Sequence, residues 1–89
     1  MIGIVLHNNE RTVPSDLYVS VNDLNQAGGP LILTNQRINV DQTFALNVQE
    51  DQNGSGSITW TATATDDASK TNQATITVSD GGTVEVASW

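Results

Sequence analysis

Cysteine is absent from this 89-residue chain, and proline occurs only twice. Without cysteine, the chain can form no disulfide, no thiolate metal site and no cysteine nucleophile. No segment approaches the roughly 18 consecutive apolar residues that a membrane span requires. The first residues, 1–7, lack the basic region and the cleavage site of a signal peptide. Membrane insertion is therefore not expected, while the compartment, cytoplasmic or extracellular, stays open.

Basic side chains are nearly as scarce, since the chain has Arg11, Arg37 and Lys70 against ten acidic residues. The formal net charge is −7. Proteins that bind nucleic acids neutralise phosphates with clustered lysine and arginine, and anionic membrane surfaces attract the same residues. We therefore expect neither nucleic acid nor an anionic membrane surface among the partners.

The residues that are abundant favour β-strands. Val, Ile and Thr together occupy 26 positions, and Asn, Gln, Ser and Thr occupy 33. β-branched side chains fit a pleated sheet, while neutral amides and hydroxyls give it a polar surface without charge. A chain of this length forms one domain, expected to span residues 1–89.

The clearest strand signal lies at residues 57–64, where apolar side chains alternate with threonines. Strict alternation predicts a half-buried strand whose hydroxyl groups face outward. The pattern recurs at 74–78 and at 83–86, and the sequence Asp-Gly-Gly at 80–82 lies between them. Because glycine accepts positive φ angles, this turn predicts a hairpin, and residues 57–87 predict a three-stranded antiparallel meander.

The first half of the chain predicts further short strands, at residues 2–6, 17–21, 31–33, 37–40 and 43–48. No stretch shows the 3.6-residue apolar period of a helix. Six to seven short strands separated by Gly, Asn and Asp turns are typical of a small antiparallel β-sandwich, so the predicted fold class is all-β. The side chains expected to face its core are Ile4, Leu6, Leu17, Val19, Val21, Leu33, Ile38, Phe44, Leu46, Val48, Ile58, Trp60, Ile76, Val78, Val84 and Val86.

Candidate catalytic residues are few. His7, the one histidine, ends the first predicted strand, where a solvated polar side chain is the ordinary role. Water keeps the pKa of a carboxyl in a turn near its usual value, and turns are the expected place of Glu50, Asp51, Asp66, Asp67 and Asp80. A catalytic acid needs a desolvated cleft, and so small a domain leaves little room for one. We expect no enzyme activity.

A segment beginning at Asp51 matches the first eight positions of a calcium-binding loop. Oxygens of Asp51, Asn53 and Ser55 take the ligand positions one, three and five. Position twelve, where a bidentate Glu is needed, is Ala62, and no helices flank the segment. A hairpin turn with Asn53-Gly54 at its tip explains the same residues, because both types accept positive φ. Weak calcium binding and a structural turn are the two alternatives, and no other cofactor is indicated.

Aromatic side chains make up only 4% of the chain, so the position of each one is informative. Alternation places Tyr18 on the outer face of its strand and Trp60 on the inner face. Trp89 is the last residue, and three roles are open to it: closing the core, packing on a neighbouring subunit, or stacking on a sugar. Tyr18 and Trp89, with Asp51 and Asn53, are the candidate ligand-binding residues.

The threonines of segments 57–64 and 74–78 share one predicted outer face. Such a face is either the ordinary solvated side of a sheet or a flat neutral surface that packs on a second sheet. Edge strands with little charge would also permit strand addition between chains. A homo-oligomer is therefore one of the open alternatives.

Between residues 2 and 60, several short features follow one another in a defined order. They are Gly28-Gly29, Arg37-Ile38, the sequence Asp-Gln-Thr-Phe-Ala-Leu-Asn-Val at 41–48, Gly56, and Ile58-Thr59-Trp60. This order resembles the early strands of thaumatin-like proteins and related β-1,3-glucan-acting β-sandwiches. The resemblance implies a β-sandwich and contact with glucans or a cell surface. The chain lacks that family's disulfides and acidic cleft, and Asp41 replaces a usual glycine, so no catalytic residue is carried over.

These observations favour a non-catalytic, lectin-like binding module whose partner is a carbohydrate or cell-surface glycan. The alternative, from a different class, is a self-assembling structural subunit of a surface filament or virus particle. In that case the threonine face, the sheet edges and Trp89 would lie between copies.

Overall fold

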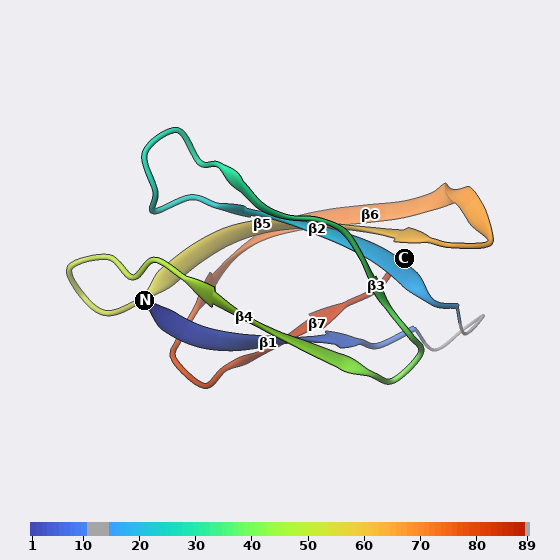
Figure 1. Ribbon diagram of the computed structural model, residues 1–89, viewed down its shortest axis with the longest axis horizontal. Helices are drawn as coiled ribbons and strands as arrows, with labels where there is room; N and C mark the ends of the chain where they lie inside the picture. Colours follow the sequence, from blue (N-terminus) through green and yellow to red (C-terminus); the bar gives the residue numbers. More distant parts are fainter. Residues whose placement is uncertain (11–14, 89) are drawn as a thin grey trace.

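The computed structural model describes residues 1–10 and 15–88. Seven strands follow one another along the chain (Figure 1): β1 (Ile2–Asn8), β2 (Leu17–Asp23), β3 (Leu31–Ile38), β4 (Thr43–Val48), β5 (Gly56–Ala64), β6 (Asp67–Val78) and β7 (Thr83–Val86). These residues contain no helix, and so none that could cross a membrane. The prediction of a small all-β sandwich with six to seven strands is confirmed.

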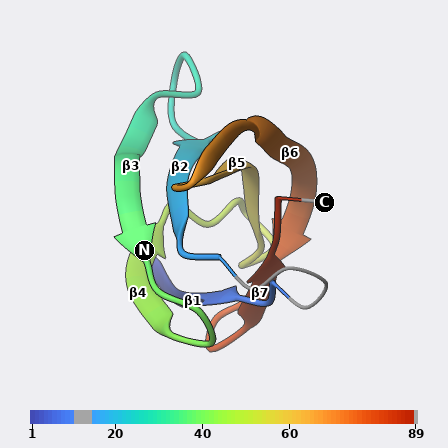
Figure 2. The ribbon, with the colours of Figure 1, turned by 90° about the vertical axis from the view of Figure 1, so that its right-hand side faces the viewer.

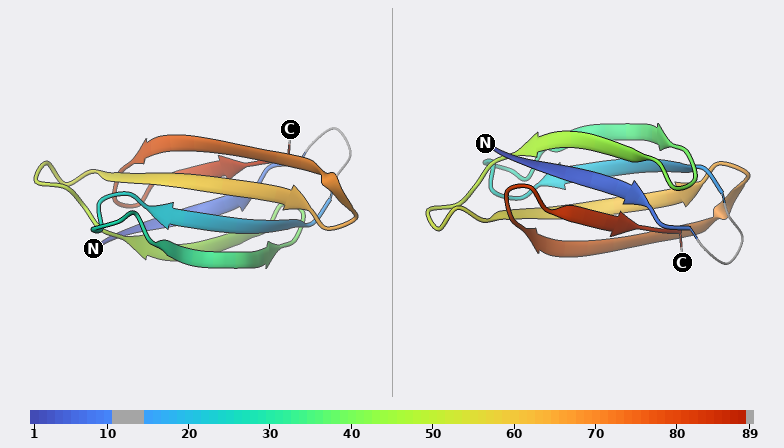
Figure 3. Two further views of the ribbon diagram at one scale, coloured as in Figure 1. Left: turned by 90° about the horizontal axis from the view of Figure 1, so that it is seen from above. Right: turned by 90° about the horizontal axis from the view of Figure 1, so that it is seen from below.

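The strands form two sheets packed face to face (Figure 2), one in the order β4-β1-β7 and the other in the order β3-β2-β5-β6. The hairpins β2–β3 and β5–β6 stay within the four-stranded sheet, whereas the other connections pass from one sheet to the other. Figure 3 shows each sheet from its outer side. All strand pairs are antiparallel except β1 and β7, which run parallel from Val5 opposite Thr83 to Asn8 opposite Val86.

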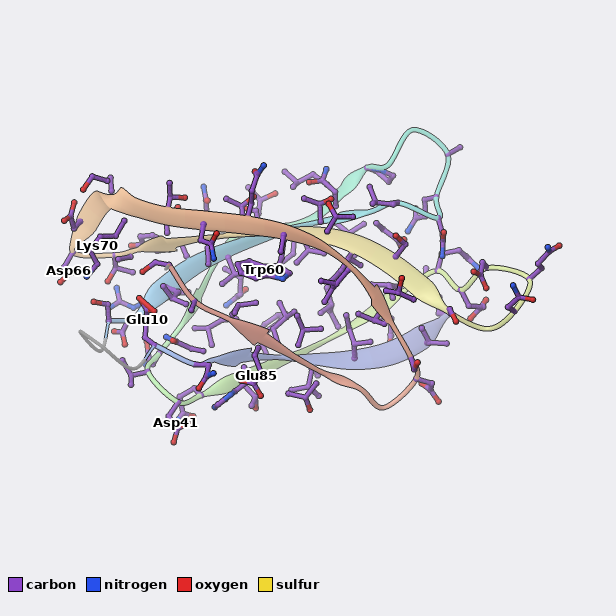
Figure 4. All side chains as sticks on the ribbon, turned by 180° about the vertical axis from the view of Figure 1, so that it is seen from behind. Glu10, Asp41, Trp60, Asp66, Lys70 and Glu85 are labelled. Atoms are coloured by element: carbon purple, nitrogen blue, oxygen red, sulfur yellow. The ribbon has the colours of Figure 1, made fainter. Side chains whose placement is uncertain are left out.

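The core lies between the sheets and is built by alternate residues of the central strands. Buried and partly exposed positions alternate along all of β1 and β5. Trp60 lies between the two sheets (Figure 4) with 5% of its surface exposed. Every residue predicted to face the core is buried, except Leu33, Phe44, Leu46 and Ile76, which are partly buried and pack against it.

The predicted meander over residues 57–87 is wrong at its last strand. β5 and β6 form the expected hairpin, but β7 belongs to the other sheet, where it pairs with β1. The turn at 79–82 supplies the physical reason, because its polar groups bond to β1. Gly81 N donates to the Gly3 carbonyl at 2.7 Å, and Asp80 Oδ1 accepts from Gly3 N at 2.9 Å. These bonds direct the chain into the second sheet instead of back along β6.

The segment around Asn53-Gly54 is not a hairpin tip, as the sequence suggested, but a connection between the two sheets. It follows β4 in the three-stranded sheet and leads to β5 in the four-stranded sheet. Gly54 has the expected positive φ, of 82°. Two other predicted elements differ in extent: residues 31–33 and 37–40 join into the single strand β3, and β6 begins at Asp67, well before residue 74.

Gly56, at the start of β5, marks a point where the two sheets leave no room for a side chain. A Cβ atom there would lie 2.7 Å from Val78 Cγ2 and 2.9 Å from Val48 Cγ2. We expect Gly56→Ala to lower the free energy of unfolding by about 1–3 kcal/mol, because the core must shift to accept the methyl group.

Gly3→Ala is the matched control, since the nearest atom to its new Cβ, Asn47 Oδ1, would lie 3.5 Å away, an ordinary contact. Urea denaturation of the three proteins measures the difference. Equal stability of the two variants would contradict the close approach at Gly56.

Candidate binding site

The outer side of the four-stranded sheet carries a regular array of neutral polar side chains, here called the hydroxyl face. Strand register places its residues in rows that run across β2, β5 and β6: Tyr18, Thr63 and Thr71; Ser20, Thr61 and Gln73; Asn22, Thr59 and Thr75; and then Ser57 and Thr77. Neighbouring strands lie about 4.8 Å apart, and side chains on one face recur about every 6.7 Å along a strand. The face is therefore a regular grid of hydroxyl and amide groups.

Cross-strand hydrogen bonds hold the threonines of this grid in place. Thr59 Oγ1 and Thr75 Oγ1 lie 2.8 Å apart, and Thr63 Oγ1 and Thr71 Oγ1 lie 3.0 Å apart. Each pair uses one hydroxyl hydrogen and leaves the other available to a ligand. The two pairs are thus preorganised to donate and accept further hydrogen bonds.

A shallow pocket of about 270 Å³ opens on the β5–β6 side of the hydroxyl face. Thr61, Thr71, Asn72 and Gln73 line it. Thr61 and Gln73 are cross-strand neighbours, so a hydroxyl and an amide stand side by side at its base. The lining contains no charged side chain, and its chemistry suits a neutral ligand with several hydroxyl groups.

Tyr18 supplies an aromatic ring at one corner of the grid. Its side chain is on the outer face, as predicted, with 39% of its surface exposed. Its neighbours in register are Thr63 on β5 and Arg37 on β3. The ring is therefore flanked by a hydroxyl on one side and a guanidinium on the other.

An ion pair fixes the guanidinium beside Tyr18. Arg37 Nη2 donates to Asp16 Oδ2 at 2.6 Å, and Asp16 Oδ1 accepts from the Val40 N–H at 3.0 Å. The bond to Asp16 raises the pKa of Arg37 above its usual value, and the Tyr18 hydroxyl adds to this shift. The bond to Arg37, and then the one to Val40, lowers the pKa of Asp16. The corner is thus polar but carries no net charge.

The structure does not bring the Asp51 segment to this corner. Tyr18 pairs with Thr63 near the end of β5, whereas Asp51 and Asn53 precede the first residue of β5, Gly56. Seven residues of extended strand, roughly 23 Å, separate those two levels of the sheet. The candidate ligand-binding residues of the sequence therefore fall at opposite ends of the sandwich, and Trp89 lies outside the described residues.

Within the Asp51 segment, the carboxylate is engaged by the backbone of its own loop. Asp51 Oδ1 accepts from Asn53 N at 2.7 Å and from Ser55 N at 3.0 Å. The same loop closes through Asp51 N, which donates to the Ser55 carbonyl at 2.7 Å. In the described part of the chain, no group of three or more His, Cys, Asp or Glu side chains is placed to hold a metal ion. These contacts provide a structural role for Asp51 that needs no cation.

The outer side of the other sheet carries a cluster that sequence reasoning missed. His7 points outward from β1, and each nitrogen of its imidazole meets a carboxylate: Nδ1 lies 2.5 Å from Glu85 Oε2, and Nε2 lies 2.7 Å from Asp41 Oδ1. Glu85 is its partner in the parallel β1–β7 register. Asp41 is itself a turn residue with a φ of 61°, and its N–H donates to the Asn8 carbonyl. The bond to Glu85, and next the bond to Asp41, raises the pKa of His7 above 6.5.

Two further acids are buried, although the sequence pattern marked neither of them. Asp23 is fully buried and accepts hydrogen bonds from the Gln49 N–H at 2.8 Å and the Gln26 side chain at 2.9 Å, which join two loops. Glu10 is also buried and accepts from both the N–H and the hydroxyl of Ser88. These carboxylates hold chain segments together at the two ends of the sandwich. Their oxygens are occupied by structural bonds.

One acid expected in a turn lies elsewhere. Asp67 is the first residue of β6, and its pKa is lowered by hydrogen bonds from the hydroxyl and the N–H of Ser69. Asp66 accepts from the Ser15 hydroxyl at 3.2 Å. The other three acids of that group, Glu50, Asp51 and Asp80, do lie in connections between strands.

Comparison with protein-family models, with curated proteins and with solved structures gives no match for this chain.

The His7 cluster generates a prediction about pH. A raised pKa in the folded state contributes stability that is fully present below the unfolded pKa of about 6.5 and is lost as pH rises through the folded pKa. We expect the difference in free energy of unfolding between the native protein and His7→Gln to be largest below pH 6.5 and to shrink above the raised folded pKa.

Denaturation curves at a series of pH values, with an NMR titration of the imidazole, measure both quantities. Glu85→Gln should bring the imidazole pKa back toward its ordinary value, since it removes the larger cause of the shift. A difference that stays constant with pH would contradict the cluster.

Proposed function

We propose that this chain is a non-catalytic binding module for carbohydrate or a cell-surface glycan, and that the hydroxyl face is its binding surface. The observation that carries the proposal is the exposed Tyr18 ring at the corner of a rigid grid of hydroxyl and amide groups. Sugars present an apolar C–H face and a rim of hydroxyls, and an aromatic ring beside fixed polar groups complements both.

Three sets of polar groups near Tyr18 would form the hydrogen bonds to the hydroxyl groups of the sugar. Arg37 and Asp16 offer charge-assisted hydrogen bonds at the ring's edge. The Thr63–Thr71 pair lies next to the ring in the same row, and the shallow pocket at Thr61 and Gln73 lies one row further along. A chain of sugar units laid across the sheet would meet the ring first and the pocket next.

Charge also supports a neutral ligand over other classes. The hydroxyl face holds no cluster of lysine and arginine that could attract phosphates. The buried carboxylates Asp23 and Glu10 are engaged in structural bonds, and the exposed ones are solvated. The geometry thus supports binding without catalysis. The resemblance of residues 2–60 to β-1,3-glucan-acting sandwiches suggests a glucan as the first ligand to try.

The alternative of a self-assembling structural subunit is favoured by a different feature. β6 forms one edge of the four-stranded sheet, and its segment 71–78, which pairs continuously with β5, carries no charged side chain. Edges of this kind permit strand addition between chains.

The glycan proposal is tested at Tyr18. We expect Tyr18→Ala to weaken binding at least about tenfold, which corresponds to about 1.4 kcal/mol, because the variant removes the stacking surface. Tyr18→Phe keeps the ring and should retain most of the affinity. Since Tyr18 is exposed, both variants should keep the native circular dichroism spectrum and melting temperature within a few degrees.

A glycan array identifies the ligand, and calorimetric titration with soluble β-1,3-glucan oligosaccharide measures the affinity. Thr61→Val serves as a second arm at the pocket, where loss of one hydroxyl should weaken binding without unfolding the sheet. An array without a hit would overturn the proposal, and so would a hit that Tyr18→Ala leaves unchanged.

A further inference from the structure

The outer edge of β6 is a long strand edge without a neighbour. In the four-stranded sheet β6 pairs with β5 on one side, and no other strand of the described chain pairs with it on the other (Figure 3). Pairing with β5 is continuous from Thr71 to Val78. This eight-residue segment, 71–78, reads Thr-Asn-Gln-Ala-Thr-Ile-Thr-Val.

The segment lacks the features that usually protect a sheet edge. Soluble proteins interrupt exposed edges with charged side chains, proline or β-bulges, and segment 71–78 contains none of these. The opposite edge, β3, is interrupted by register shifts and by Asn35 with φ of 48°. β7 has four residues and carries Glu85, and the six-residue β4 is followed closely by the acids Glu50 and Asp51.

Hydrogen bonding identifies which backbone groups of β6 face outward. The Gln73 N–H donates to the Asn72 side chain at 2.9 Å and is therefore directed away from β5. In an antiparallel pair, outward and inward bonding alternates with every residue. Thr75 and Thr77 consequently direct their N–H and C=O groups to the open edge. The close Thr59–Thr75 hydroxyl contact agrees, because side chains are nearest in pairs that do not bond through the backbone.

Charge favours a second copy of the chain as the occupant of this edge. Two copies with a net charge of −7 each repel one another wherever their acids meet. Asp41 and Glu85 lie on the outer side of the other sheet, and Glu50 and Asp51 lie in the loop between β4 and β5. Segment 71–78 of β6 contains no charged side chain, so pairing along it places no acid of one copy directly opposite an acid of the other.

An antiparallel arrangement also brings opposite charges together at the ends of the segment. With a two-fold axis at Thr75, residue 70 of one copy lies at the level of residue 80 of the other. Those residues are Lys70 and Asp80. Ala74 and Ile76, which are only partly buried on the inner side of β6, would lose further exposed surface to the second copy.

We propose that β6 pairs antiparallel with β6 of a second copy across a two-fold axis at Thr75, so that two four-stranded sheets join into one sheet of eight strands. Thr75 of each copy exchanges both backbone hydrogen bonds with Thr75 of the other, and Thr77 pairs with Gln73 once Asn72 releases the Gln73 N–H. The pairing goes beyond glycan binding and does not rest on it, since it uses the edge of the sheet and not its face.

The test is Thr75→Pro with Thr75→Val as its matched control. Proline removes the Thr75 N–H, which points to the open edge and is not used by β5, and proline is tolerated at such edge positions. Valine removes the hydroxyl contact to Thr59 but keeps the N–H. Sedimentation equilibrium over a concentration series should show the native chain and Thr75→Val moving from 9.5 kDa toward twice that mass, and Thr75→Pro remaining at 9.5 kDa.

Amide exchange of the unmodified protein gives a second readout that needs no variant. The Thr75 and Thr77 amides should exchange more slowly as concentration rises, while the exposed turn amide of Gly54 does not change. A chain that stays monomeric throughout the series overturns the proposal. A folded Thr75→Pro that still dimerises overturns it as well, because the contact then lies elsewhere. Sedimentation of Tyr18→Ala separates the two proposals, because this variant removes the aromatic ring of the glycan site and leaves the backbone of β6 unchanged, so it should still dimerise.

Discussion

The register of β5 is the constraint on which the rest of this structure depends. β5 lies inside the four-stranded sheet, between β2 and β6, and its residues alternate between buried and partly exposed without interruption. Ile58, Trp60 and Ala62 fill the core from this strand. A shift by one residue would bury three threonines and expose the tryptophan, so the hydrophobic side fixes the register strongly. The same register creates the hydroxyl face.

The strands could be read from the sequence, because alternation is a property of neighbouring residues. The assignment of strands to sheets could not, and β7 is the clearest example. Asp80-Gly81-Gly82 has the composition of a hairpin turn, yet its polar groups bond to Gly3, which lies 77 residues away from Asp80 in the chain. A local pattern contains no information about such a partner. The same limit applies to the loop at Asn53. The positive φ of Gly54 was correctly predicted, but the sequence did not show that this loop leads from one sheet to the other.

The candidate site shows the same division between local and distant information. Tyr18 could be placed on an outer face from its own strand alone. The His7 cluster could not be found, because Glu85 and Asp41 lie 78 and 34 residues from His7 and meet it through a parallel strand pair and a left-handed turn residue. Asp23 and Glu10 were missed for a related reason. A carboxylate is tolerated in the interior when backbone and side-chain donors surround it, and those donors come from other parts of the chain.

The distribution of charge links the two proposed interactions. Asp41 and Glu85 meet His7 on the outer side of the three-stranded sheet, whereas the hydroxyl face carries neutral groups and the Arg37–Asp16 pair, which has no net charge. The face of such a sheet can bind the hydroxyl groups of a ligand, and its edge can bind the backbone of another strand. Pairing at β6 would leave Tyr18 uncovered, because the second copy joins the edge of the sheet, whereas Tyr18 lies on the outer face of β2, with β5 between it and β6. It would also extend the grid across the two-fold axis, so that one long glycan could meet two Tyr18 rings. Affinity for a repeating polymer would then rise through the second contact, with no change in either site.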